Sequence, residues 1–128
     1  MSTTSERTRG DVVLVSYPLI STGLTSRKLR PAVVVSSDAN NRRLPDVTLI
    51  PLTSKTQRPL EATHLLLLQR TPEGRQAGIQ LDSVIKAETI LTVPKFLIHK
   101  TIGHLPPHLM SEVDRCLAIA LGLIPTQP

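Results

Sequence analysis

The run Arg30-Pro31-Ala32-Val33-Val34-Val35-Ser36-Ser37 is the strongest strand signal in this chain. A basic residue and a proline lead into alanine and valine, and two serines end the run. β-Branched residues favour strands, whereas serine favours the turn that follows. A second apolar run ends in the adjacent hydroxyls of Thr53 and Ser54. We therefore predict strands at 31–36 and 46–52, each with polar side chains where it meets a loop.

Other short apolar segments continue the β pattern along the chain. They predict strands at 11–17, 64–68, 79–85 and 89–93. The leucine run at 64–68 suggests a strand that is buried on both faces. Short strands separated by turn signals are typical of a curved sheet.

The connections between these strands are polar. Residues 18–30 include Arg27 and Lys28, and they predict a long basic loop. The segments 38–45 and 71–78 are rich in turn residues and are expected to be turns. Long loops in compact domains are often functional, so the loop at 18–30 is a candidate binding element.

The C-terminal region predicts one amphipathic helix. Pro106 and Pro107 suit its first turn, while Gly122 and then Pro125 suit its end. Its apolar stripe consists of Leu109, Val113, Cys116, Leu117, Ala120 and Leu121. A further short helical turn is expected at 94–98. Several strands followed by one helix predict a mainly β fold, in which a small, strongly curved barrel carries the helix across it.

Length and composition fit one globular domain. The chain has 128 residues, of which 40% are hydrophobic. We expect the domain at 10–124, a flexible segment at 1–9 and a short tail at 125–128. Aromatic residues make up only 2%, so the core must be aliphatic.

The chain is basic, with a formal net charge of +5 and a pI of about 10.0. This charge suits an anionic partner such as nucleic acid or an acidic protein segment. A basic protein without such a partner would have the same composition, so charge alone leaves both possibilities open.

Several classes of protein are not favoured. The single cysteine, Cys116, excludes an internal disulfide and fits a reducing compartment. The N-terminus has no apolar signal-peptide core, and no apolar run approaches the roughly 18 residues of a membrane span. We therefore expect a cytoplasmic protein without membrane contact. His99, His104 and His108 have no accompanying cysteine or carboxylate cluster, so neither a metal nor a cofactor is expected.

Short motifs follow one another in a recognisable order over residues 9–123. They are Gly10-Asp11-Val12, Arg30-Pro31, Pro51-Leu52-Thr53-Ser54, Ala77-Gly78, Lys86-Ala87-Glu88-Thr89-Ile90 and Lys100-Thr101-Ile102-Gly103-His104. Each motif is weak alone, but the ordered series resembles the MazF/PemK family of toxin endoribonucleases, and within it the PemK-like branch. The chain departs from many members at Ser26-Arg27-Lys28-Leu29 and at Glu88-Thr89-Ile90. These departures bear on loop contacts and cleavage sequence more than on the chemistry.

The resemblance implies an SH3-like barrel of the PemK/MazF type with a C-terminal helix. It also implies a homodimer and an antitoxin partner with an acidic or apolar tail. The implied activity is that of a type II toxin, which cuts single-stranded mRNA at specific sequences without a metal and so inhibits translation and growth. The family's catalytic arginine precedes the proline of the second strand and corresponds to Arg30. Its catalytic threonine ends the third strand and corresponds to Thr53.

Polar residues beside these two positions are candidate RNA contacts. They are Arg27, Lys28, Ser54, Lys55 and Lys86. If the basic loops meet at one end of the barrel, these side chains form a phosphate-binding groove. The alternative is a set of separate, solvated charges.

The chemistry of RNA cleavage explains why these residue types are suitable. RNA carries its own nucleophile, the 2′-OH, so the protein must align it, remove its proton and stabilise the extra negative charge. Arg30 offers a bidentate guanidinium, and Thr53 offers a hydroxyl on a stiff side chain. The sequence does not identify the general base that takes the 2′-OH proton. Two alternatives also stay open: a catalytically silent module that binds RNA or protein, and a gyrase-poisoning toxin of the same fold.

Overall fold

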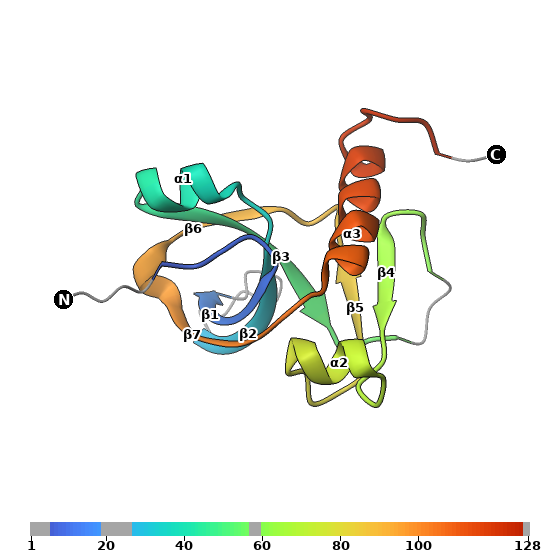
Figure 1. The fold of residues 1–128 in the computed structure, drawn as a ribbon, viewed down its shortest axis with the longest axis horizontal. Coiled ribbons are helices and arrows are strands. Elements are labelled where there is room, and N and C mark those ends of the chain that lie inside the picture. The colour runs from blue at the N-terminus through green and yellow to red at the C-terminus, as the bar shows by residue number, and fades with distance from the viewer. Residues whose placement is uncertain (1–5, 19–26, 57–59, 127–128) are drawn as a thin grey trace.

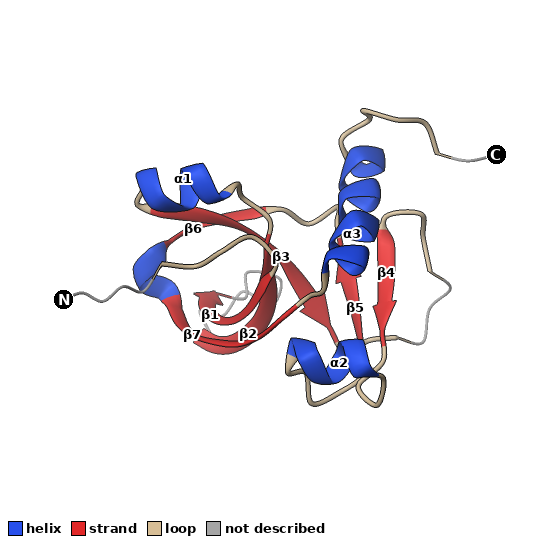
Figure 2. Cartoon of the chain, in the orientation of Figure 1, coloured by secondary structure: helices blue, strands red, loops and turns tan. Residues whose placement is uncertain are grey.

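The computed structural model describes residues 6–18, 27–56 and 60–126. This part of the chain forms a seven-stranded antiparallel sheet with short helices and a longer C-terminal helix (Figures 1 and 2). The strands are β1 (Asp11–Pro18), β2 (Arg27–Val34), β3 (Asp46–Thr53), β4 (His64–Leu67), β5 (Ser83–Lys86), β6 (Leu91–Pro94) and β7 (Ile98–His104). The helices are α1 (Asp38–Arg43), α2 (Pro72–Ala77), the 3₁₀ turn η1 (Lys95–Leu97) and α3 (Pro107–Ala120).

Strand β3 joins two parts of the sheet. The strand order is β4-β5-β3-β2-β1-β7, and β6 also pairs with β3. Residues 46–49 of β3 pair with β6 and residues 49–51 pair with β2, whereas residues 52–53 pair with β5. One long strand therefore passes from a larger curved sheet into a small sheet, and α3 lies beside the small sheet and contacts β4 (Figure 1).

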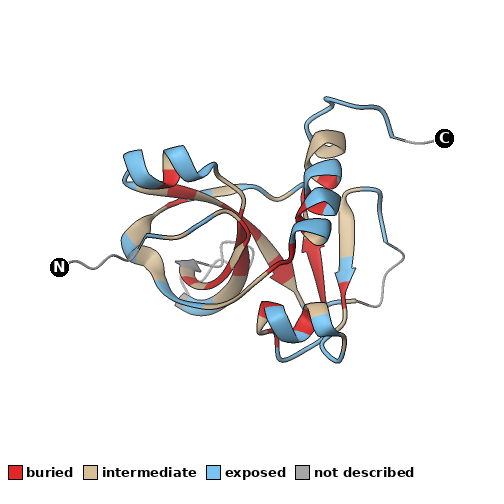
Figure 3. Ribbon diagram, in the orientation of Figure 1, coloured by how far each residue is buried: buried red, intermediate tan, exposed pale blue. Residues whose placement is uncertain are grey.

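Two aliphatic clusters lie on opposite faces of the larger sheet, and alternation along its strands creates them. Val12, Val33 and Ile50 belong to the cluster that α3 and α2 cover. Val13 and Leu49 belong to the second cluster, inside the curve of β1, β2, β3 and β6. Figure 3 shows buried residues concentrated in the strands and on one side of α3. The expected mainly β fold with a C-terminal helix is confirmed, although strand pairing does not close the sheet among the described residues.

The basic segment before Pro31 was expected to be a loop, and this prediction is wrong for residues 27–30. They form the first half of β2, and the β1–β2 ladder runs to the pair Pro18↔Arg27. A strand paired with β1 satisfies its backbone groups, which outweighs the weak β propensity of basic residues. Residues 19–26 of the expected loop lie outside the described residues.

Two expected turns are helices. The segment 38–45 contains α1, and Ser37 caps it by accepting a hydrogen bond from the Asn40 N–H at 3.1 Å. The segment 71–78 contains α2, which Thr71 caps in the same way at 3.1 Å. Serine and threonine favour both turns and helix N-caps, so the residue types alone did not distinguish them.

Smaller differences concern the strands. The strand at 64–68 was expected to be buried on both faces, but Leu66 is 40% exposed, so this prediction is wrong. Strand β7 was not expected from the sequence. The strands expected at 79–85 and 89–93 are shorter and begin at Ser83 and Leu91. The helical turn at 94–98 is confirmed by η1.

The C-terminal helix is confirmed, including its end. Gly122 has a φ of +73°, and its N–H donates to the Ile119 carbonyl at 3.0 Å. The Leu123 N–H donates to the Ala118 carbonyl at 2.8 Å, which completes a Schellman motif. None of the described helices is long and apolar enough to cross a membrane. The expected terminal segments at 1–9 and 125–128 lie partly outside the described residues.

Candidate functional site

A groove opens where β3 changes partners. The β2–β3 ladder ends at the pair Ala32↔Pro51, and the next residue of β3, Leu52, already pairs with Ile85 of β5. Pro31 and Pro51 have no backbone N–H, so neither can donate a ladder bond at this point. Strand β3 lies between β2 and β5 in the sheet, and the groove opens over the end of β3, where the ladder with β2 has stopped.

This groove has a volume of about 850 Å³ and contains both predicted catalytic residues. Its polar lining consists of Arg30, Thr53, Ser54, Lys55, Gln80, Ser83, Lys86, Thr89 and Lys100. Its apolar lining includes Leu14, Leu29, Pro31, Leu52, Leu81 and Ile102. Cationic and hydroxyl side chains thus surround a partly aliphatic surface, which suits a ligand that carries anionic groups and apolar surface.

The structure brings together five of the seven residues that were predicted to form the site: Arg30, Thr53, Ser54, Lys55 and Lys86. Lys28 is exposed on β2 and does not line the groove. The side chain of Arg27 lies outside the described residues. The roles of these residues in catalysis and RNA binding stay predictions.

Arg30 lies where its charge is available to a ligand. Continuing the β2–β3 register by two residues would bring Arg30 opposite Thr53, just beyond the last pair. The Arg30 Nε is buried and has no hydrogen-bond partner among the described residues, and none of them forms an ion pair with its guanidinium. An unpaired buried donor is costly, so a bound anion would relieve that cost.

The hydroxyl of Thr53 is held in place by its own backbone. Its Oγ1 accepts a hydrogen bond from the Lys55 N–H at 3.2 Å. This short turn uses an oxygen lone pair and leaves the hydroxyl proton available for donation. Thr53 can therefore donate to an oxygen of a bound ligand without losing its backbone contact.

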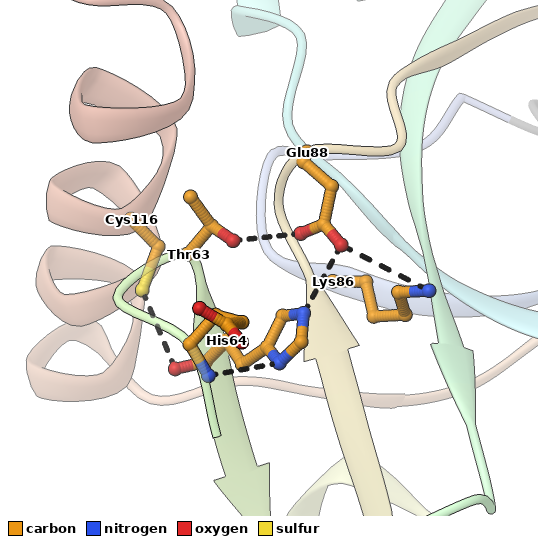
Figure 4. Close-up of polar contacts among 6 residues, drawn as sticks. Thr63, His64, Lys86, Glu88 and Cys116 are labelled. Carbon is orange, nitrogen blue, oxygen red and sulfur yellow. Dashed lines mark hydrogen bonds and ion pairs between the residues drawn. The ribbon is translucent and has the colours of Figure 1, made fainter. Parts of the chain in front are cut away.

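Lys86 enters the groove from β5 and is tethered to Glu88. Its Nζ lies 3.8 Å from Oε2 of Glu88, whose other oxygen accepts from the Thr63 hydroxyl at 2.8 Å (Figure 4). His64 Nε2 lies 3.0 Å from the same Oε2. The Glu88 carboxylate thus lies beside the amine of Lys86 and partly neutralises its charge.

The orientation of His64 follows from its second ring nitrogen. Nδ1 lies 3.2 Å from the Glu61 N–H and accepts from it, so Nε2 carries the proton that is donated to Glu88. Partial burial alone would raise the pKa of Glu88, but hydrogen bonds from His64 and Thr63 outweigh this effect and lower that pKa. Figure 4 also shows Cys116 beside this cluster, where its thiol lies 3.8 Å from the His64 carbonyl.

Cys116 and the other histidines belong to the scaffold. Burial raises the pKa of the Cys116 thiol, which keeps it in the unreactive protonated form. His104 Nδ1 lies 2.9 Å from Asp11, and His108 Nε2 lies 3.1 Å from Glu73. Among the described residues, no group of three or more His, Cys, Asp or Glu side chains is arranged to hold a metal ion.

The groove has no acidic or imidazole side chain. None of the Asp, Glu or His residues that the structure describes lines it. The residues outside the description contain none of these three types, so the chain has no others. The titratable side chains that line the groove are therefore cationic.

Sequence reasoning missed several of the lining residues. Lys100 reaches the groove from β7, Ser83 from the start of β5, and Gln80 and Thr89 from the connections on either side of β5. The motif series included Lys100 and Thr89 as positions of similarity only. An expectation of a strand at 98–104 would have pointed to Lys100, but the segment lacks a clean alternation of apolar and polar residues.

Comparisons with known proteins identify the family of this chain. Residues 8–121 match the family model described as "PemK-like, MazF-like toxin of type II toxin-antitoxin system". The endoribonuclease EndoA of Bacillus subtilis (strain 168) is 32% identical over 117 residues, which cover 91% of this chain and 95% of that protein.

Solved structures show the same fold. An endoribonuclease in complex with its cognate antitoxin from Mycobacterial species has a TM-score of 0.69 and 27% identity, over 94% of this chain and 99% of that one. MazE-MazF (Form-II) from Deinococcus radiodurans has a TM-score of 0.73 at 19% identity, over 94% of this chain and 100% of that one. At that identity the second likeness concerns the fold alone.

Proposed function

Because this chain belongs to the PemK-like, MazF-like family of toxins of type II toxin-antitoxin systems, we propose that it is an endoribonuclease that cuts single-stranded RNA in the groove between β2 and β5. The family resemblance inferred from the motifs is confirmed by the family match. One observation carries the assignment of the site: the change of partners by β3 gathers Arg30, Thr53 and three lysines in one groove.

The proposed reaction uses the nucleophile of the substrate. The 2′-OH gives up its proton to hydroxide or an amine, its oxygen attacks the adjacent phosphorus, and the P–O5′ bond breaks. The leaving 5′-oxygen takes a proton from water, so the products are a 2′,3′-cyclic phosphate and a free 5′-OH. Arg30 binds the nonbridging oxygens and stabilises the charge that grows on them. Thr53 donates its hydroxyl proton to one of the same oxygens. Substitution of one such donor lowers the rate by about 10²–10³-fold in comparable sites.

The other lining residues hold the strand. Lys55 and Lys86 bring positive charge to both sides of Thr53, where they attract RNA phosphates. The aliphatic surface of Leu14, Leu29 and Leu81 offers a place for unstacked bases, which a single strand can provide and a duplex cannot. The substrate is therefore a single-stranded segment, with mRNA as the cellular form and the cytoplasm as the compartment.

The proposed partners follow from the site and the relatives. One structurally similar endoribonuclease is in complex with its cognate antitoxin, and MazF occurs with MazE in another. A cationic groove of this kind suits an acidic segment of an antitoxin, which would compete with RNA for the same cations. We propose that the protein acts as a homodimer, with one such groove on each copy.

The test is cleavage of a long single-stranded RNA in EDTA by the wild type, Arg30→Ala and Thr53→Ala. We expect discrete cuts with the wild type, and loss of these cuts in both variants. Arg42→Ala is the matched control, because Arg42 is exposed on α1 and lies outside the groove. Binding of RNA without any cleavage would instead support the silent binding module, and cuts that persist in Arg30→Ala would refute the assigned roles.

A further inference from the structure

Lys100 lines the groove from β7, which lies two strands away from the strand β2 that carries Arg30. Leu14 of β1 pairs with Pro31 on one side and with Lys100 on the other. These three residues thus form one row across β2, β1 and β7, and all three line the groove. With strands about 4.8 Å apart, the Cα atom of Lys100 lies about 10 Å from that of Pro31, the neighbour of Arg30.

The charge of Lys100 is not neutralised by the chain. Its side chain is exposed, and it forms no ion pair or hydrogen bond with any described residue. Its neighbours in the groove, Leu14 and Ile102, are apolar. Lys86 differs, because Glu88 lies 3.8 Å from its amine. A lysine without a partner beside an aliphatic surface has its full charge available for a ligand anion.

The backbone of β7 just after Lys100, at Ile102 and Gly103, is held in place by close packing. A Cβ atom on Gly78 would lie only 2.0 Å from the Ile102 carbonyl oxygen, and one on Gly103 would lie 2.2 Å from the Ala77 carbonyl carbon. The end of α2 therefore lies directly against β7, with glycine at both contacts. Since β1 holds the other edge of β7, Lys100 is presented from a strand that is packed on both sides.

We propose that Lys100 binds a backbone phosphate of the RNA other than the scissile one, and that this contact sets how the strand lies in the groove. The proposal rests on the proposed endoribonuclease function. An RNA strand whose scissile phosphate lies between Arg30 and Thr53 would cross the aliphatic surface to reach β7. With the two backbones about 10 Å apart, Lys100 is placed to meet a phosphate beside the scissile one while Arg30 holds the scissile phosphate, and the experiment below identifies which phosphate Lys100 contacts. Lys100 is thus a positioning residue.

The experiment measures binding of a short RNA that carries a 2′-deoxy sugar at the cut site, so that it is not cleaved. In a set of such RNAs, each phosphate in turn is replaced by an uncharged methylphosphonate. The proteins are the wild type, Lys100→Ala, Lys100→Gln and the control Lys95→Ala, since Lys95 lies on η1 outside the groove.

We expect Lys100→Ala and Lys100→Gln to bind the unmodified RNA about tenfold more weakly, as loss of one charge-assisted contact predicts. The slope of log K against log salt should decrease by about 0.7, the value for one phosphate of a single strand. One methylphosphonate position should weaken wild-type binding about tenfold and leave binding by both Lys100 variants unchanged. With the unmodified 2′-OH substrate, KM should rise while kcat at saturating RNA changes little.

Other outcomes distinguish a wrong role for Lys100 from a wrong proposed function. If every methylphosphonate weakens the wild type and Lys100→Ala equally, Lys100 does not contact a phosphate and the proposal is wrong. A changed cleavage sequence without a phosphate-specific effect would assign Lys100 to a base and would likewise overturn it. If the wild type neither binds nor cuts RNA, the proposed function itself fails, which differs from an active enzyme that is indifferent to Lys100.

Discussion

The pH dependence of cleavage gives the sharpest test of the proposed chemistry. Ordinary Asp, Glu and His side chains titrate between about 4 and 6.5, and no side chain of these types lines the groove. No such group is therefore positioned to take the 2′-OH proton. Within the groove of one copy, the acceptors that remain for this proton are hydroxide and the small neutral fraction of a lysine amine.

The expected change of the cleavage rate with pH follows from these two proton acceptors. Both remaining acceptors become about tenfold more abundant with each pH unit, as long as the amine stays mostly protonated. Between pH 5 and pH 8 the cleavage rate should therefore rise by about 10³-fold, with a slope near 1 and no plateau. An enzyme with a carboxylate or imidazole base would level off above the pKa of that base.

The assay is single-turnover cleavage with protein in saturating excess, so that neither binding nor product release limits the rate. Reactions with Arg30→Ala correct for the uncatalysed hydrolysis of RNA at each pH. Binding of an uncleavable 2′-deoxy RNA, measured over the same range, shows that the protein stays folded. Glu88→Gln should keep the same slope, because Glu88 lies outside the groove lining.

A plateau that begins between pH 5 and pH 7 would refute this reasoning if it persists with a slower phosphorothioate substrate. Such a plateau would show that a titrating base takes the proton, supplied by this copy or by its dimer partner. A plateau that disappears with the slower substrate reports a step other than chemistry, and the expected slope should then be recovered.

Three further predictions concern the scaffold. Gly78→Ala should lower the free energy of unfolding by more than about 2 kcal/mol, because φ is +76° and the new Cβ would lie 2.0 Å from a carbonyl oxygen. Gly122 has a similar φ of +73° but open space around it, so Gly122→Ala should lower the free energy of unfolding by only about 1 kcal/mol. Urea unfolding of both variants measures the difference. The lowered pKa of Glu88 predicts stability that is present above its unfolded pKa and lost as pH falls through its folded pKa, so Glu88→Gln should flatten the acid limb of the melting temperature. Asn41→Ala should cost about 2–3 kcal/mol, because Asn41 is fully buried and bonds the Ser36 carbonyl and hydroxyl.

Each of these predictions has an outcome that contradicts it. Equal losses from the Gly78 and Gly122 substitutions would show that the close approach to β7 carries no cost. An acid limb that is identical in Glu88→Gln would mean that the bonds from His64 and Thr63 do not favour the ionised carboxylate. Near-neutral stability of Asn41→Ala would mean that water replaces its contacts at little cost.

Much of the fold could be predicted because it depends on local pattern. The valine run of β2 and the apolar run of β3 show strand propensity directly, and the stripe ending at Gly122 shows a helix with its C-cap. Strand β7 could not be predicted in this way. Its segment has exposed residues at its centre, and it is a strand because β1 supplies the hydrogen bonds.

The same distinction between local sequence pattern and tertiary pairing applies to the candidate site. Arg30 and Thr53 could be selected from sequence because each sits beside a proline-marked strand in a recognisable motif. That they face one groove depends on where β3 leaves β2 for β5, which is a property of strand pairing. Lys86 was predicted to line this groove, whereas Lys100 reaches it from β7, a strand that sequence reasoning did not predict.

The sequence by itself determined the strand-rich character, the C-terminal helix, the aliphatic core and the basic charge. Each of these follows from residue type and spacing within a short window, so it needs no knowledge of distant contacts. Only the tertiary structure decided which cations share the groove, that Arg30 has no ionic partner there, and that no carboxylate or imidazole joins them. Those facts depend on strand register, because one change of partner along β3 fixes which distant side chains meet.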